Sequence, residues 1–199
     1  GADEIFGGYL YLRNAPTVEN FQKETIERVQ KLFTADLLRA DKSTMAHGLE
    51  ARVPFLDKAF LDMAVRIKPE EKMPKTYDGK EKYILRKAFD TPDNPYLPDE
   101  VLWRQKEQFS DGVGYNWIDQ LIEYCSSQVT DEQLAGAEAE FSYNTPTTKE
   151  AYFYRSIFNK YYPQVSAAQT VRKWIPKWQE NQDPSGRANA AHVQADVEI

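Results

Sequence analysis

Residues 101–114 (VLWRQKEQFSDGVG) crowd cationic, aromatic, acidic and glycine residues into one short run. The apolar residues of this run recur neither every second residue nor every 3.6 residues, which predicts a loop after a helix start at residues 98–100. Arg104 and Lys106 bring two cations together, and the turn residues 110–112 could pin the loop against another segment. Loops held in this way often carry binding residues. A solvated charged loop explains the same residues, and on these residues alone it is the favoured interpretation.

Asp3 and Glu4 are the first pair of carboxylates, and they follow a glycine at a predicted helix start. Capping explains their position, because the N–H groups and the dipole at a helix N-terminus favour negative charge. Their oxygens would also suit a Mg²⁺ ion that bridges to substrate phosphates. Without further context the capping interpretation is favoured.

Two further acid–base pairs occur in the first third of the chain. A single long amphipathic helix is predicted over residues 17–48, with apolar residues at three- and four-residue intervals. Asp36 and Arg39 are three residues apart in this helix and are therefore neighbours. They could form a surface ion pair or bind a charged substrate, and both interpretations are open. Glu50 and Arg52, two residues apart in a predicted extended piece, could pair structurally or around a small charged substrate.

The composition is that of a globular protein with a high aromatic content of 13%. At 199 residues the chain can bury one core and carry an irregular tail. The net charge of −6, without a basic stripe, argues against a nucleic-acid partner. No apolar run is long enough to span a bilayer, so no membrane partner is expected.

Cys125 is the one cysteine of the sequence, which excludes an internal disulfide and any site with several cysteine ligands. This cysteine usage fits a reducing compartment, and we expect a cytoplasmic protein. Cys125 lies among apolar neighbours without a base beside it in the sequence. We therefore predict that it is a buried small hydrophobe and not a nucleophile.

Helical patterns dominate the rest of the chain, and strand-like alternation is nearly absent. Shorter helices are predicted between proline and glycine turns, over residues 83–89, 117–125 and 149–162. Beyond Pro163 the pattern fades. The sequence therefore predicts a mostly α fold, in which residues 1–162 form the helical domain and residues 163–199 a partly irregular C-terminal tail.

Six short motifs carry more information than the periodicity: residues 1–9 (GADEIFGGY), 39–42 (RADK), 47–57 (HGLEARVPFLD), 103–112 (WRQKEQFSDG), 144–146 (NTP) and 183–187 (DPSGR). In this order, and spread over nearly the whole chain, they resemble the C-terminal half of a glutamine-hydrolysing asparagine synthetase. The resemblance implies the helical half of a PP-loop ATP pyrophosphatase-like (adenine-nucleotide α-hydrolase-like) α/β synthetase domain, with the parallel-sheet half largely absent.

In that family, ATP activates the side-chain carboxylate of L-aspartate as an acyl-adenylate, and ammonia from glutamine then gives asparagine, AMP and pyrophosphate. The resemblance therefore implies ATP and Mg²⁺ as cofactors. Because adenylation places negative charge on the phosphates, preorganised cations should make the largest catalytic contribution. Lys106 matches the family lysine that resembles such a stabiliser, and Arg104 is a second candidate. Asp3 and Glu4 match the acidic pair on the Mg²⁺ and pyrophosphate side.

The resemblance also suggests an aspartate pocket. Asp36 and Arg39 match positions near this pocket, where an arginine suits a carboxylate and an acid suits the substrate's ammonium. Glu50 and Arg52 are assigned to its support. The nearest alternative is a β-lactam synthetase-like enzyme, which adenylates a different carboxylate on a similar fold, and Asp36 with Arg39 favours aspartate over it.

Several parts of the family pattern have no match in this sequence. They are the ATP-binding serine-glycine-glycine loop, the N-terminal cysteine that hydrolyses glutamine, and the serine-glycine-glutamate that precedes Gly1. The chain holds no glutaminase nucleophile, since Cys125 is internal. We therefore expect an inactive fragment of a ligase that takes ammonia from an N-terminal glutaminase domain. The parent's oligomeric state is open, with a homodimer as the candidate, and a non-catalytic helical scaffold is a second alternative function.

Overall fold

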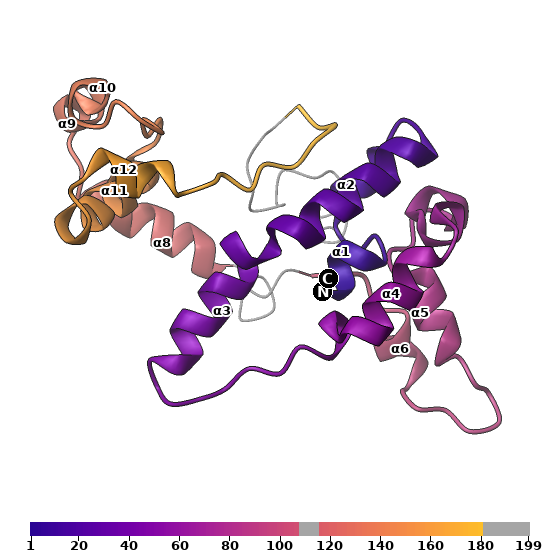
Figure 1. Cartoon of the computed structure of the whole chain (residues 1–199). Helices are drawn as coiled ribbons and strands as arrows, with labels where there is room; N and C mark the ends of the chain where they lie inside the picture. Colours follow the sequence, from indigo (N-terminus) through magenta and orange to yellow (C-terminus); the bar gives the residue numbers. More distant parts are fainter. Residues whose placement is uncertain (108–115, 181–199) are drawn as a thin grey trace. The chain divides into compact units, whose positions relative to one another are not determined.

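The computed structural model describes residues 1–107 and 116–180 (Figure 1). The turn residues 110–112 and the motif at residues 183–187 lie outside this part. The described residues form α-helices and short 3₁₀ helices, without a β-strand among them. The predicted mostly α fold is confirmed at this level. Two compact units are present: unit 1 comprises Gly1–Lys106 and Trp174–Ile199, and unit 2 comprises Glu107–Lys173.

Unit 1 begins with the short helix α1 and is built around the longer helix α2. Its α-helices are α1 (Ala2–Ile5), α2 (Val18–Lys31), α3 (Asp36–Met45), α4 (Lys58–Arg66), α5 (Tyr83–Ala88) and α6 (Asp99–Leu102). Its 3₁₀ helices are η1 (Leu10–Asn14), η2 (Leu32–Thr34), η3 (Pro54–Leu56), η4 (Pro69–Lys72) and η5 (Pro74–Tyr77). The predicted helix at residues 83–89 and the helix start at residues 98–100 are confirmed.

The prediction of one continuous helix over residues 17–48 is wrong. The chain leaves the α-helix after Lys31, makes the 3₁₀ turn η2, and starts α3 at Asp36. At Thr34 the hydroxyl donates to the Lys31 carbonyl oxygen, an alternative to the regular helical ladder. Ala35 is not helical (φ −130°, ψ −103°). The break places the Asp36 carboxylate at the beginning of a new helix, where a negative charge is favoured.

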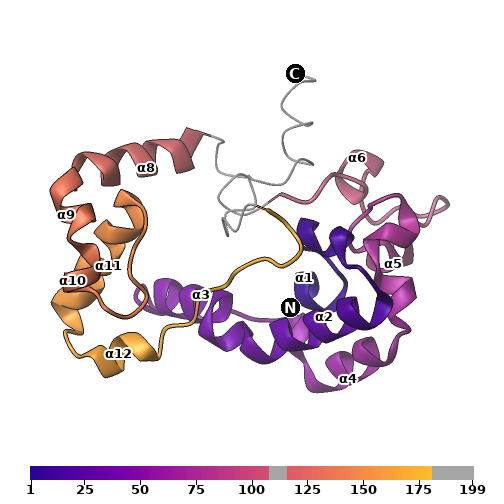
Figure 2. The ribbon, with the colours of Figure 1, turned by 90° about the horizontal axis from the view of Figure 1, so that it is seen from above.

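The core of unit 1 contains two buried clusters. One cluster contains Tyr11, Leu12, Ala15, Phe21 and Met73. The other contains Ile5, Phe6 and Ala64, with partly buried residues of α4 and α5 packed against it. Contacts of α1 with α2 and α4 hold these clusters together, and Figure 2 shows the three helices side by side. The residues of α1 are thereby fixed within the unit.

Unit 2 is a small helical bundle of α8 (Asn116–Ser127), α9 (Asp131–Ala135), α10 (Ala137–Glu140), α11 (Lys149–Tyr161) and α12 (Val165–Gln169). Its buried core comprises Val129, Ala137, Phe141 and Tyr152, and α8 contacts α11. The predicted helices over residues 117–125 and 149–162 are confirmed to within about one residue at most ends. Cys125 is fully buried, as predicted.

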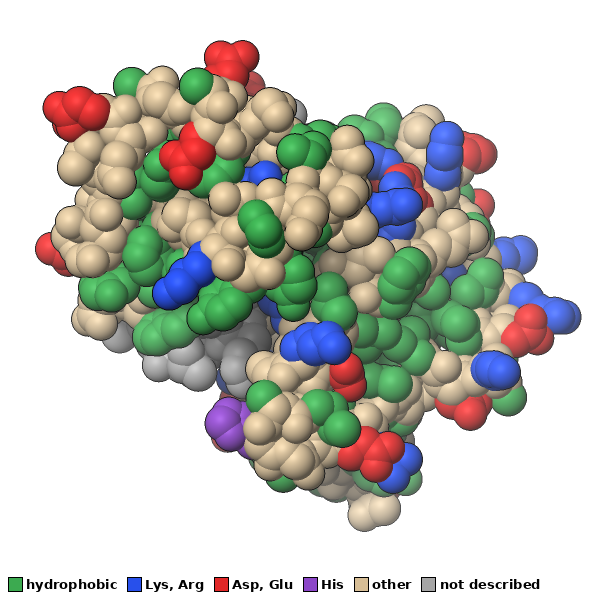
Figure 3. All heavy atoms as spheres, turned by 60° about the vertical axis from the view of Figure 1, so that its left-hand side comes forward, with side chains coloured by type: hydrophobic (Ala, Val, Ile, Leu, Met, Phe, Trp, Pro, Cys, Tyr) green, Lys and Arg blue, Asp and Glu red, His purple; other side chains and the backbone are tan. Residues whose placement is uncertain are grey.

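Unit 2 leaves many large apolar side chains at its surface, where hydrophobic side chains gather in the space-filling view (Figure 3). Those at least 36% exposed include Trp117, Ile122, Tyr124, Tyr154, Ile157, Tyr161, Tyr162, Val165 and Val171. An apolar surface of this kind is unusual for an independent domain. Among residues 1–107 and 116–180, no helix is both long enough and apolar enough to cross a membrane.

Candidate active site

The turn at Gly7 and Gly8, which follows α1 in the sequence, determines the geometry of the site. Gly7 has φ +67°, which favours glycine, and a Cβ on it would lie 2.8 Å from the Lys72 carbonyl oxygen. A Cβ on Gly8 would lie 2.0 Å from Oδ1 of Asp3. The Gly8 N–H donates to the Asp3 carbonyl oxygen over 2.8 Å. The turn therefore folds the chain tightly back on α1 and returns Tyr9 to the carboxylates of that helix.

Tyr9 connects two of the predicted acidic residues. Its hydroxyl is within hydrogen-bonding distance of Glu4 Oε1 and lies 3.1 Å from Asp36 Oδ2. Burial raises the pKa of Tyr9, and the negative charges of Glu4 and Asp36 raise it further. The hydroxyl therefore stays protonated and remains a donor toward these carboxylates. Glu4 is itself only 2% exposed, so its oxygens depend on protein partners.

Asp36 and Arg39 form an ion pair on α3. The Asp36 side chain is 44% exposed and the Arg39 side chain 75% exposed, so both groups remain open to solvent. The Tyr9 hydroxyl connects this ion pair to the buried Glu4, because it contacts both Asp36 and Glu4. Asp36 thus has one oxygen directed to the interior of unit 1 and the other to an exposed arginine.

Lys106 reaches the same cluster from the loop that follows α6. Its ammonium lies 5.6 Å from the centre of the Tyr9 ring, a cation–π arrangement. The Lys106 backbone N–H donates to Oε1 of the buried Glu81 over 2.5 Å. Three separate stretches of the sequence therefore meet around one tyrosine.

The Asp3–Glu4 pair fits a small hard cation by its donor chemistry. Oδ1 of Asp3 and Oε2 of Glu4 are buried and accept no hydrogen bond from the described residues, although Lys82 Nζ lies 3.2 Å from Asp3 Oδ1 and the Gly1 amino group 2.6 Å from Glu4 Oε2. Mg²⁺ is commonly held by one or two carboxylates together with substrate phosphates. Within the described parts, no group of three or more His, Cys, Asp or Glu side chains could hold a metal by itself.

The other predicted site residues have no contact with this cluster in the part of the chain that the structure describes. Arg104 is exposed. Glu50 and Arg52 pair with each other over 3.1 Å, and their side chains are 67% and 82% exposed. The fold thus brings together five of the predicted residues: Asp3, Glu4, Asp36, Arg39 and Lys106. It does not bring Arg104, Glu50 or Arg52 to them.

Sequence reasoning missed Tyr9, Glu81 and Lys82 as members of the cluster. Tyr9 belongs to the first motif, but no spacing rule indicated that its hydroxyl would reach Asp36. Glu81 and Lys82 lie in a polar connection between predicted helices, where charged residues are usually solvated. Their contacts with Lys106 and Asp3 depend on tertiary packing.

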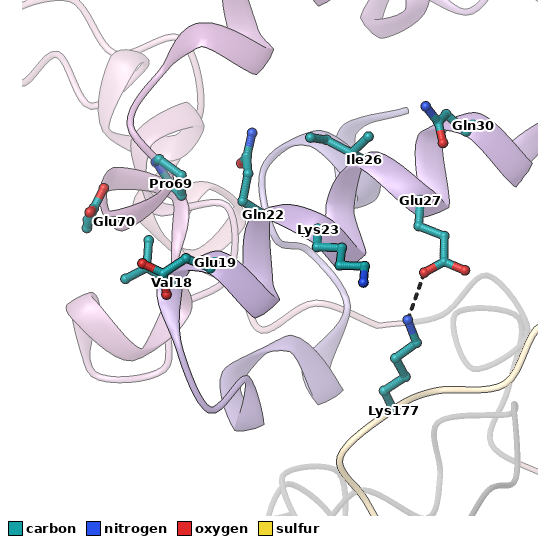
Figure 4. Close-up of a pocket in the computed structure, with 10 residues that line it drawn as sticks. All are labelled: Val18, Glu19, Gln22, Lys23, Ile26, Glu27, Gln30, Pro69, Glu70 and Lys177. Carbon is teal, nitrogen blue, oxygen red and sulfur yellow. Dashed lines mark hydrogen bonds and ion pairs between the residues drawn. The ribbon is translucent and has the colours of Figure 1, made fainter.

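A separate groove in unit 1 lies along α2, away from this cluster. It is a groove of about 940 Å³ lined by residues of α2, by Pro69 and Glu70, and by Lys177. Figure 4 shows Lys177 reaching toward Glu27 across it, with 2.8 Å between Nζ and Oε2. None of the predicted site residues lines this groove, so it is distinct from the candidate site.

The model of the asparagine synthase family matches residues 13–183, which is most of the chain. The chain belongs to the asparagine synthase family, and the resemblance found in the motifs is confirmed.

Individual relatives are similar over nearly the whole chain. The glutamine-hydrolysing asparagine synthetase 1 of Saccharomyces cerevisiae is 56% identical over 199 residues, which cover 96% of this chain and 35% of the yeast protein. A probable glutamine-hydrolysing asparagine synthetase of Schizosaccharomyces pombe is 55% identical, over 98% of this chain and 36% of the relative. A probable one of Dictyostelium discoideum is 54% identical, over 97% of this chain and 36% of the relative. The chain therefore spans about a third of the length of these relatives.

Proposed function

We propose that this chain is part of an ATP-dependent asparagine synthetase that adenylates the side-chain carboxylate of L-aspartate and amidates it with ammonia derived from glutamine. The observation that supports this most directly is the convergence of Lys106, Glu4 and Asp36 on Tyr9. A cation, the buried Glu4 and an exposed acid–arginine pair lie in one place. Adenylation of an amino acid can use such groups to stabilise phosphate charge and to bind the substrate's ammonium and carboxylate.

Lys106 is proposed to stabilise the negative charge that develops on the α-phosphate and the leaving pyrophosphate. An ammonium held over an aromatic ring is preorganised, and preorganised charge is usually the largest contribution to catalysis. The flexible stem of lysine allows the ammonium to follow that charge as the phosphate geometry changes. Arg104 remains the proposed second cation, because its exposed side chain is free to turn toward a bound nucleotide.

Asp36 and Arg39 are proposed to bind the substrate aspartate by exchange of partners. Each residue of the pair is exposed enough to meet a ligand. The α-ammonium of aspartate can replace Arg39 at the Asp36 carboxylate, while a substrate carboxylate pairs with the guanidinium in a bidentate manner. The exchange keeps every charge paired. Glu50 and Arg52 are proposed to support the pocket through the connection that follows α3.

Asp3 and Glu4 are proposed to hold Mg²⁺ on the pyrophosphate side, in line with their buried and only partly satisfied oxygens. When bound, the ion would neutralise charge on the phosphates of ATP. Lys82, 3.2 Å from Asp3, compensates part of the negative charge of the pair.

The complete protein is proposed to contain two further parts. One is the parallel-sheet half of the PP-loop-like synthetase domain, which carries the ATP-binding loop. The other is an N-terminal glutaminase domain that supplies ammonia. The chain matches only 35% and 36% of the length of the yeast and Dictyostelium relatives, so a complete protein of that length could contain both parts. The present chain is therefore proposed to be inactive by itself.

The test is ATP–pyrophosphate exchange with Mg²⁺, with and without aspartate, on this chain and on the complete protein that contains it. Exchange that requires aspartate and occurs only in the complete protein is the expected result. Exchange that requires a different carboxylic acid would favour the β-lactam synthetase-like alternative. If the folded complete protein shows no exchange with any carboxylate, the scaffold alternative replaces this proposal.

A further inference from the structure

A largely buried ion pair between Glu81 and Arg86 contacts the backbone of the loop that carries Lys106. Arg86 Nη2 is 3.0 Å from Glu81 Oε1, and the two side chains are 14% and 6% exposed. Arg86 Nε also donates to the Glu81 carbonyl oxygen over 2.9 Å. The arginine thus holds both the side chain and the backbone of the glutamate in one orientation.

The same pair holds the chain at two points of the loop that carries Lys106, one at its start and one at Lys106 itself. Arg86 Nη1 donates to the Leu102 carbonyl oxygen at the end of α6 over 2.6 Å. The Lys106 backbone N–H donates to Glu81 Oε1. Residues 103–105 lie between these two anchors and have no regular secondary structure of their own. Glu81 and Arg86 therefore hold the backbone on both sides of residues 103–105, at Leu102 and at Lys106.

The turn that presents Glu81 contains two non-glycine residues in the left-handed region of backbone conformation. Asp78 (φ +53°), Gly79 (φ +80°) and Lys82 (φ +55°) all lie in the left-handed region. Side chains from other parts of unit 1 contact the turn: Arg13 Nη2 donates to the Gly79 carbonyl oxygen over 2.8 Å, and Lys82 pairs with Asp3. Non-glycine residues keep such a conformation only where surrounding contacts impose it. The strained turn places Glu81 toward Lys106 and, next to it, Lys82 toward the acidic pair.

We propose that Glu81 and Arg86 are positioning residues for Lys106, which fix its backbone so that its ammonium stays over Tyr9 at the phosphate side of the site. Neither residue is proposed to touch the substrate. This inference rests on the proposed function for its effect on catalysis, but the structural effect on Lys106 can be measured without it.

The kinetic test uses ATP–pyrophosphate exchange by the complete protein. Because a displacement of about 1 Å can cost about 10²-fold in rate, Glu81→Ala should lower kcat by about 10- to 100-fold and change the KM for aspartate little. Glu81→Gln keeps an oxygen that can accept from the Lys106 N–H, and it should restore most of kcat. In a Lys106→Ala background, Glu81→Ala should cause less than about a twofold further loss, because both changes act through one group.

Asp62→Ala is the matched control. The Asp62–Arg66 pair on α4 has the same 3.0 Å separation as Glu81–Arg86, but its side chains are 66% and 77% exposed. This variant should leave kcat unchanged. Equal losses in Asp62→Ala and Glu81→Ala, or full additivity of Glu81→Ala with Lys106→Ala, would overturn the proposal.

The structural test follows the methyl signals of reductively ¹³C-methylated lysines by NMR, with the Lys106 signal assigned from its loss in Lys106→Arg. A methylammonium over the Tyr9 ring experiences a ring-current shift, and Glu81→Ala should move this signal toward the position of solvated lysines. An unchanged signal overturns the proposal. A wild-type protein without exchange activity, but with a Lys106 signal that moves in Glu81→Ala, contradicts the proposed function and leaves the positioning role standing.

Discussion

The Lys106 ammonium lies 5.6 Å from the centre of the Tyr9 ring, and the hydroxyl of the same tyrosine is within hydrogen-bonding distance of Glu4 and Asp36. One side chain thus meets a cation on its face and two anions at its edge. A cation–π contact is worth about 0.5 to 2 kcal/mol, depending on its desolvation. Tyr9 therefore keeps groups of opposite charge at defined positions without allowing them to neutralise each other in a direct ion pair.

Replacement of Lys106 by alanine should abolish most of the adenylation activity of the complete protein. The loss of one preorganised charge-stabilising group typically lowers kcat by about 10²–10³-fold, and ATP–pyrophosphate exchange measures this directly. Lys160→Ala is the matched control, because its ammonium lies 6.0 Å from the Tyr161 ring in unit 2 and is outside the candidate site. A normal exchange rate in Lys106→Ala would remove this lysine from the proposed mechanism.

Tyr9→Phe should destabilise the protein while preserving the ring beneath Lys106. Loss of the hydroxyl deprives the buried Glu4 of a donor, which should lower the free energy of unfolding by about 1–3 kcal/mol. Thermal or urea unfolding of the complete protein measures the change. Tyr77→Phe removes a 2.7 Å hydrogen bond to the exposed Glu71 and should cost no more than about 0.5 kcal/mol. Similar losses in the two variants would contradict a structural role for the Tyr9 hydroxyl.

Arg28→Met should release residues 174–178 from α2. Arg28 is 2.6 Å from the buried Glu24, lies 4.4 Å from the Trp174 ring and donates to the Ile175 carbonyl oxygen. Although burial raises the pKa of Glu24, hydrogen bonds from Lys177, Tyr11 and Arg28 outweigh it and lower the pKa overall. Removal of one member of a buried pair costs about 3–5 kcal/mol, and Lys177 at 2.5 Å should keep the loss near the lower end.

Amide hydrogen exchange of residues 174–178 is the measurement for this prediction, and the variant should exchange faster there than the wild type. Lys31→Met provides the control, since Lys31 pairs with Glu27 at the same four-residue spacing on α2 but is 42% exposed. An exposed pair of this kind contributes only about 0.3–0.5 kcal/mol. Unchanged exchange in Arg28→Met would show that the segment is held by other contacts.

Lys72→Met should stabilise the protein at neutral pH. Lys72 is 3% exposed, and its ammonium donates to the Ala64 carbonyl oxygen over 3.1 Å. Burial lowers its pKa from the ordinary value of 10.5. The cost of burying a charge, several kcal/mol, exceeds the roughly 1 kcal/mol of one hydrogen bond. We expect a gain of about 1–2 kcal/mol.

The pH dependence of the unfolding free energy provides a second readout for Lys72. Between its lowered pKa and 10.5, the unfolded chain binds more protons at this side chain than the folded protein does. Stability should therefore rise with pH in this window, and Lys72→Met should make the rise shallower. Lys75→Met, at an exposed position on η5, should change neither quantity. A destabilised Lys72→Met variant with an unchanged pH slope would contradict this account of the buried lysine.

The sequence alone indicated the helical fold, the helices at residues 83–89, 117–125 and 149–162, and the burial of Cys125. These features depend on local periodicity and on short-range turn chemistry, which a single segment expresses by itself. The motifs indicated the family, and the comparison with known proteins confirmed it. The same local reasoning failed at residues 32–35, where a side-chain hydrogen bond and the burial of Leu32 interrupt an otherwise helical pattern.

Only the tertiary structure decided which charged residues belong together. Asp3, Glu4, Asp36 and Lys106 meet because a glycine turn and the Glu81–Arg86 pair bring distant segments to Tyr9. Glu50 with Arg52 has the same type of charge pairing in the sequence, yet that pair stays at the surface. Residue types and spacing determine what chemistry a side chain can perform. Packing of segments far apart in the chain determines which side chains can perform it together, and no local pattern encodes that proximity.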